Sequence, residues 1–153
     1  MEFEFISSKA DFTAFNEARS GIVKLYNASS ALHEEAEYLD PAIADSFDAF
    51  VLRIKGETGG IAMEKLIGNE RVAIITFAAI EEKYRGNSII KKMIAKAGTI
   101  IHKEHNAMLC AVQLNDGDDI GIWFHLGFVD KYPLENGTLA LVAPAGLQAS
   151  YSL

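Results

Sequence analysis

The chain has 153 residues, of which half are hydrophobic, and its formal net charge at pH 7 is −7. This length and apolar content predict one globular domain over residues 1–153, and the negative charge disfavours nucleic acid and anionic membrane surfaces, which attract Lys and Arg. The N-terminal "MEFEFISS" is acidic, unlike a secretory signal, and the longest uncharged apolar run, residues 72–80, is too short to cross a bilayer, so we expect a cytoplasmic protein without membrane contact.

The N-terminal region predicts one strand followed by helices. Residues 2–6 alternate between acidic and apolar side chains, as in a short strand. A helix over about 9–26 follows, with Ser7 or Ser8 as its N-cap, because these residues precede an apolar helical stripe. A second helical stretch, 31–39, is rich in glutamate.

Six further strands and two helices are predicted downstream. Apolar runs separated by the hairpin-like turns "KGETGG" and "GNE" predict strands at 49–54, 60–67 and 71–80. From Ile89 onward the apolar residues follow the stripe of an amphipathic helix that ends near 103–106. The remaining elements are a buried strand, a short helix and two strands, at 107–112, 119–127, 128–132 and 138–143.

The order of these elements predicts the sheet. The strand at 71–80, the helix from Ile89 and the strand at 107–112 form a strand–helix–strand unit, which requires parallel pairing. The hairpins elsewhere require antiparallel pairing. We therefore predict an α/β (α+β) fold with a mixed, mostly antiparallel central sheet flanked by helices.

The segment "EKYRGNSIIKKMI", residues 82–94, runs from the end of a strand into the start of a helix. The first N–H groups of a helix lack intrahelical partners and carry partial positive charge, so a helix start suits a pyrophosphate. Four basic side chains add full charges: Lys83, Arg85, Lys91 and Lys92. A second interpretation is an ordinary helix capped by Asn87 or Ser88 with solvated lysines. The residues alone leave both interpretations open.

Two motifs give the chain a resemblance to the GNAT (GCN5-related N-acetyltransferase) family. Arg85 and Gly86 fit the start of the family's RxxGxG/A segment, which follows its fourth strand, and "LGF" at 126–128 fits its later YxxLGF-like segment. Two residues depart from the first motif. Ser88 stands where the family usually has glycine, and Ile90 stands where it usually has glycine or alanine. The predicted order of strands and helices also suits the family.

The resemblance implies that acetyl-CoA is the co-substrate. Its pyrophosphate would lie at the turn and helix start, formed by Lys83, Arg85, Gly86, Asn87, Ser88, Ile89 and Ile90. The main chain at Ala78, Ala79 and Ile80 would align the acetyl and pantetheine groups. Asn115 is expected to contact the pantetheine arm, although "NDGDD" also fits a helix-capping turn. Trp123 takes the position of a family Tyr that protonates the CoA thiolate, which an indole cannot do.

The resemblance further implies transfer of an acetyl or other acyl group from acetyl-CoA to a primary amine. Glu81 or Glu82 is the expected base, and Tyr84 is a candidate replacement for the missing acid, with His125 and Tyr132 as alternatives. The alternative function is an eroded GNAT fold that no longer uses acetyl-CoA and serves as a binding or regulatory module.

The partners are predicted from charge and from the ends of the chain. The acidic segment 34–48 would border the acceptor site in this family, so a cationic small molecule or protein amine is the expected acceptor. The four histidines show no ligand spacing, and we expect no metal. The C-terminal segment 144–153 is either a subunit contact in a homodimer or a loose tail.

Overall fold

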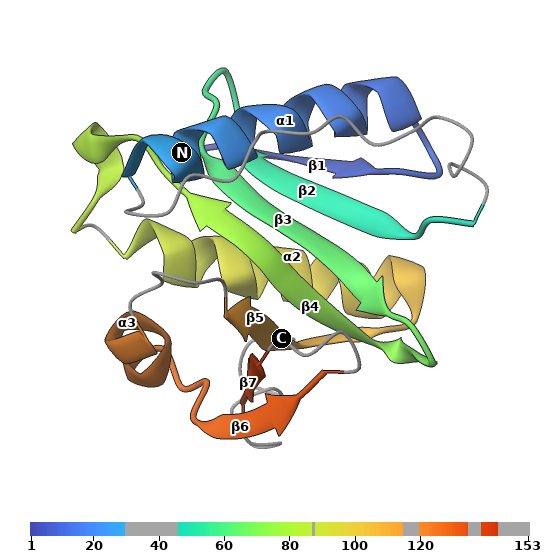
Figure 1. Cartoon of the computed structure of the whole chain (residues 1–153). Helices are drawn as coiled ribbons and strands as arrows, with labels where there is room; N and C mark the ends of the chain where they lie inside the picture. The colour runs from blue at the N-terminus through green and yellow to red at the C-terminus, as the bar shows by residue number, and fades with distance from the viewer. Residues whose placement is uncertain (30–45, 87, 115–119, 135–138, 144–153) are drawn as a thin grey trace.

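The structure, a computed structural model, describes residues 1–29, 46–86, 88–114, 120–134 and 139–143. Within these residues, seven strands form one sheet in the order β1-β2-β3-β4-β5-β7-β6 (Figure 1). In chain order the elements are β1 (Phe3–Ser7), α1 (Phe12–Ser29), β2 (Ala49–Ile54), β3 (Gly60–Leu66), β4 (Asn69–Ala79), the short 3₁₀ turn η2 (Glu82–Tyr84), α2 (Ile89–His105), β5 (Met108–Leu114), α3 (Ile120–His125), β6 (Asp130–Pro133) and β7 (Leu139–Val142).

The predicted mixed sheet is confirmed, with β4 and β5 as its parallel pair. Their register runs from Val72 opposite Met108 to Ile75 opposite Val112, and the other neighbouring strands pair antiparallel. Both strands continue past this last pair: β4 stays paired with β3 up to Ala79, and β5 stays paired with β7. The two strands therefore part at their carboxyl ends.

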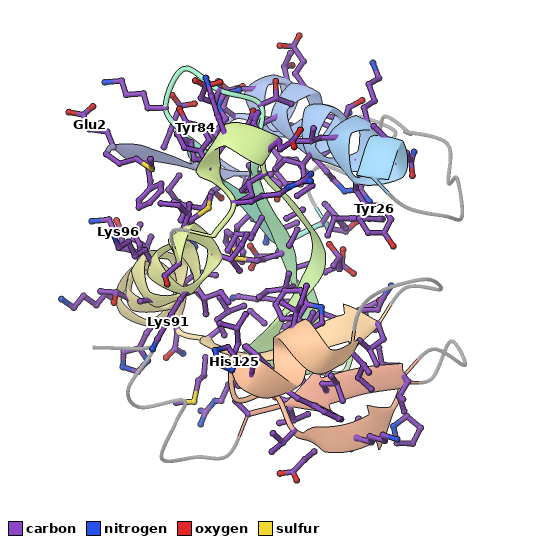
Figure 2. All side chains as sticks on the ribbon, turned by 90° about the vertical axis from the view of Figure 1, so that its left-hand side faces the viewer. Glu2, Tyr26, Tyr84, Lys91, Lys96 and His125 are labelled. Carbon is purple, nitrogen blue, oxygen red and sulfur yellow. The ribbon has the colours of Figure 1, made fainter. Side chains whose placement is uncertain are left out.

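The sheet separates two apolar layers, because side chains alternate between its faces. Figure 2 shows α1 and α2 on opposite sides of the sheet. The larger layer lies under α2, whose buried stripe includes Met93, Ile94 and Ile101. The smaller layer lies under α1, where Phe15 and Ile22 pack on β2 and β3. The predicted amphipathic faces of both helices are thus the faces that pack on the sheet.

The start of α1 differs from the expectation that Ser7 or Ser8 caps it. The cap is Asp11, whose Oδ1 accepts a hydrogen bond from the backbone N–H of Ala14 at 3.1 Å. The Ser8 hydroxyl is buried and bonds another part of the chain instead. It donates to the carbonyl of Phe47 at 2.8 Å and accepts from the N–H of Ala49 at 3.0 Å, which ties β1 to the start of β2.

Some predicted features lie outside the described residues, namely the acidic stretch 31–39, Asn87, Asn115 and the segment 144–153. Within the described ranges, no helix has both the length and the apolar character needed to span a bilayer.

Replacing Ser8 by alanine is expected to lower the free energy of unfolding by about 2 kcal/mol, because the part-buried carbonyl of Phe47 and the buried N–H of Ala49 lose their partner. Ser7→Ala is the matched control and is expected to cost less than about 0.5 kcal/mol. Chemical denaturation of both variants measures the difference. Equal losses for the two serines would contradict the structural role given to Ser8.

Candidate functional site

A cavity of about 920 Å³ lies where β4 and β5 part. Its walls come from α1, β4, η2, the start of α2, β5 and α3. Figure 2 looks onto this end of the molecule and shows Tyr84 above, Lys91 on the α2 side, Tyr26 on the α1 side and His125 below. Ten residues predicted as site residues line the cavity: Ala78, Ala79, Ile80, Tyr84, Arg85, Gly86, Ser88, Ile89, Ile90 and Trp123.

The turn between η2 and α2 contains two left-handed residues, Gly86 with φ +84° and Ser88 with φ +57°. Glycine adopts this conformation freely, whereas for serine it costs about 1–2 kcal/mol. Ser88 is the N-cap of α2 but makes no side-chain capping bond, and its side chain is exposed. The first residues of α2 thus line the cavity, and the Ser88 hydroxyl does not cap their N–H groups.

The charges at this turn favour an anion. The exposed residues Arg85 and Lys91 line the cavity, and the first turn of α2 contains no acid. The Arg85 guanidinium donates a hydrogen bond to the carbonyl of Ile80 at 3.3 Å, which links the turn to the end of β4. The positive side chains and the partial positive charge of the helix N-terminus therefore lie at the same place, which favours binding of an anion.

The cavity floor is apolar. Ile90 is partly buried and packs against the core under α2, and it lines the cavity rather than filling it. Trp123 is buried with its ring edge-on to Phe128, at 5.8 Å between ring centroids, and lines the cavity from α3. The two residues that depart from the family pattern at this point are thus wall residues.

Three predicted site residues, Glu81, Glu82 and Lys83, do not line the cavity. Glu81 follows β4, and its Oε1 accepts backbone N–H bonds from Thr58 at 2.9 Å and Gly59 at 2.7 Å. Glu82 is exposed in η2. The ammonium group of Lys83 pairs with Glu57 in the β2–β3 turn instead of facing the cavity.

Glu57 in the β2–β3 turn binds two residues of η2. Its Oε1 accepts hydrogen bonds from Lys83 Nζ and from the Tyr84 hydroxyl, both at 2.9 Å. These bonds lower the pKa of Glu57, first through Lys83 and then through Tyr84, and they raise the pKa of Lys83 and of Tyr84. Tyr84 therefore keeps its proton at neutral pH.

Sequence reasoning missed Glu57 and Tyr26 and gave His125 a minor place. Tyr26 reaches the cavity from α1, with its ring edge-on to Phe77 of β4 at 5.4 Å between centroids. In the sequence it reads as one more apolar position of a helix stripe, and no local signal marks it as a wall residue. His125, from α3, also lines the cavity. Among the described residues, no group of three or more His, Cys, Asp or Glu is arranged to hold a metal ion.

No protein-family model matches the sequence, and no curated protein matches it either. The fold, in contrast, matches solved acetyltransferases. An acetyltransferase from Thermus thermophilus gives a TM-score of 0.57 at 12% identity, over 94% of this chain and 97% of that one. The aminoglycoside acetyltransferase HMB0005 from an uncultured soil metagenomic sample gives 0.57 at 18% identity, over 86% and 95%. The PaiA N-acetyltransferase of Thermoplasma acidophilum, solved with coenzyme A, gives 0.50 at 12% identity, over 94% and 99%.

These likenesses confirm the predicted GNAT resemblance at the level of the fold. They extend over most of each chain, so the fold is shared as a whole rather than as one motif. Identities this low leave the activity and the substrate to be argued from the site itself.

The Glu57 contacts predict a pH dependence of stability. The pKa of Glu57 in the folded chain lies below the ordinary value of 4.5, so the contact stabilises the fold above that value and is lost as the pH falls through the lowered pKa. We expect the difference in free energy of unfolding between the unchanged chain and Glu57→Gln to become smaller as the pH is lowered from 7 to about 3. A gap that is independent of pH would contradict the ionic contact.

Proposed function

We propose that this chain, which has the fold of the GNAT acetyltransferases, is a cytoplasmic N-acyltransferase that moves an acetyl group from acetyl-CoA to a primary amine. The observation that carries the proposal is the cavity at the parting of β4 and β5, with a basic helix N-terminus at its mouth and a strand end in its wall. A fold alone does not set function, so the proposal depends on this combination.

The residues at the mouth suit the pyrophosphate of acetyl-CoA. Gly86 and Ser88 keep the left-handed turn although the motif glycine is absent, and a Cβ at Gly86 would meet no atom within 4 Å, so the approach is open. Arg85 and Lys91 supply positive charge beside the first N–H groups of α2, which the Ser88 side chain does not cap. When bound, acetyl-CoA supplies the activated acetyl thioester.

The end of β4 is suited to orient a thioester carbonyl. Ala78 and Ala79 lie beyond the last β4–β5 pair, and both line the cavity. The edge of β4 that would otherwise meet β5 therefore presents main-chain polar groups to the cavity. A fixed backbone N–H at this position would stabilise negative charge on a carbonyl oxygen without reorganising.

Proton transfer is assigned to residues in or next to the wall. Trp123 has no proton to donate at a suitable pKa, so we propose Tyr84 as the donor to the departing thiolate. Tyr84 lines the cavity and is protonated at neutral pH, since its pKa lies above the ordinary value of 10.0, and its hydroxyl donates to Glu57. Of the two predicted bases we propose Glu82, which is exposed and would act through water because neither carboxylate lines the cavity, whereas Glu81 Oε1 already accepts two backbone N–H bonds.

The alternative function, an eroded GNAT fold that serves as a binding module, is suggested by Ile90 and Trp123, two residues that depart from the family pattern. A chain that had given up the cofactor would have these side chains in the cavity. Both lie in its wall and leave about 920 Å³ open, which supports the enzyme over the module.

The acceptor is proposed to be a cationic amine of a small molecule or protein. Support comes from the acidic composition of the segment 34–48 and from the aminoglycoside acetyltransferase of the same fold.

Calorimetric titration with CoA tests the cofactor site. The unchanged chain is expected to bind CoA, and Arg85→Glu to weaken binding by about tenfold or more, because a charge-assisted contact to phosphate becomes a repulsion. Lys103→Glu, at the far end of α2, makes the same change of charge and should leave the affinity within about twofold. The absence of binding at millimolar CoA would overturn the proposed function.

Substitution of Trp123 tests the missing acid. Trp123→Tyr places a phenol at the wall and is expected to raise kcat with an amine acceptor by about tenfold, less than the roughly 10²–10⁴-fold of a general acid added where none exists, because Tyr84 already donates a proton. Trp123→Phe is the control that keeps the ring without the hydroxyl, and its kcat should not rise. A rise of the same size in both variants would assign the effect to packing and contradict the role of the proton.

A further inference from the structure

Two carboxylates link the β2–β3 turn to the turn that precedes α2, and each accepts hydrogen bonds from the other turn. Glu57 of the first turn accepts hydrogen bonds from Lys83 and Tyr84 of the second. Glu81 of the second turn accepts backbone N–H bonds from Thr58 and Gly59 of the first. The partners lie 22 to 27 residues apart in the sequence, so each bond fixes one turn relative to the other. We call Glu57 and Glu81 the acidic latch.

The turns approach closely at Gly59. A Cβ at Gly59 would lie 2.8 Å from the Cα of Ile80 and would overlap Glu81 Oε2. The β2–β3 turn is itself closed by the N–H of Ile54, which donates to the carbonyl of Gly59 at 3.0 Å. The end of this hairpin therefore lies directly against Ile80, the residue that follows β4.

The latch lies behind the cavity wall rather than in it. Glu57 and Glu81 do not line the cavity, whereas their neighbours Ile80, Tyr84 and Arg85 do. Arg85 donates to the carbonyl of Ile80, so the wall residues are also tied to one another. The latch thus acts on the cavity only through the turn that it holds.

The backbone conformation of Ser88 explains why the turn before α2 needs stabilising contacts. Ser88 occupies a left-handed conformation that glycine adopts without strain, and its side chain makes no capping bond to offset the strain. A strained conformation persists only where surrounding contacts determine it. The latch provides such contacts at the other end of the same turn.

We propose that Glu57 and Glu81 are positioning residues that hold the η2–α2 turn in its cofactor-binding conformation, in place of the glycine that this turn lacks. The inference rests on the proposed function, because it assigns a role in binding CoA. It predicts that loss of either carboxylate weakens CoA binding without removing any group that touches the cofactor.

The test compares alanine and amide variants of both residues by CoA titration. Glu57→Ala and Glu81→Ala are expected to weaken CoA binding about tenfold each, as when the competent conformation falls to about a tenth of the population. Glu57→Gln and Glu81→Gln keep an oxygen that accepts the same hydrogen bonds and should recover most of the affinity. In steady-state kinetics the alanine variants should raise KM for acetyl-CoA more than they lower kcat.

Glu4→Ala is the matched control for a general loss of stability. Glu4 is a partly buried carboxylate that pairs with Arg53 at 2.7 Å across β1 and β2, away from the turn. This variant should lower the unfolding midpoint as the latch variants do, while its affinity for CoA stays unchanged. An equal loss of affinity in Glu4→Ala would assign the effect to stability and overturn the positioning role.

Hydrogen exchange separates this inference from the proposed function. Without any ligand, Glu81→Ala should speed exchange at the amides of Thr58 and Gly59 and also at those of Tyr84 and Arg85, whose N–H groups donate to the carbonyls of Glu81 and Glu82. If the unchanged chain failed to bind CoA, the proposed function and the cofactor role of the latch would both fall. If it bound CoA and the alanine variants bound equally well, with exchange at Tyr84 and Arg85 as slow as in the unchanged chain, only the latch would be overturned.

Discussion

Parallel pairing between β4 and β5 stops at Ile75 and Val112, although both strands continue. Because a parallel connection needs a crossover, the chain between them forms α2, and the N-terminus of that helix is brought to the carboxyl end of β4. The parting of the strands opens the cavity at the same place. The parting of β4 and β5 thus brings together an unpaired strand edge, the N-terminus of a helix and a cavity of about 920 Å³.

The turn between β4 and α2 keeps a left-handed backbone conformation at a position occupied by serine rather than glycine. Gly86 retains the backbone freedom, but Ser88 must hold a left-handed conformation with a side chain present. Hydrogen bonds of Glu57 and Glu81 tie this segment to the β2–β3 turn and restrict its conformation. Local sequence and long-range contacts are alternative means of fixing a backbone.

The sequence predicted the elements, and the residues that meet at one cavity, better than the contacts of individual side chains. Strand β2 and the start of α2 lie where the apolar periodicity put them, since burial imposes that pattern directly. The cap of α1 is Asp11 rather than Ser7 or Ser8, because Ser8 is buried against β2, a contact between residues about 40 positions apart that no local pattern reveals. Lys83 faces Glu57 for the same reason, and the acidic segment 34–48 lies almost entirely outside the described residues.

The central claim is that the cavity between β4 and β5 binds the cofactor, and amide chemical-shift mapping with CoA tests it most directly. The account predicts that the largest changes fall on the amides of residues 78–80 and on Gly86, Ser88 and Ile89, all of which line the cavity. The hairpin at Ile67 and Gly68, at the opposite end of β4, should be unaffected. Changes confined to that hairpin, or none at saturating CoA, would contradict the account.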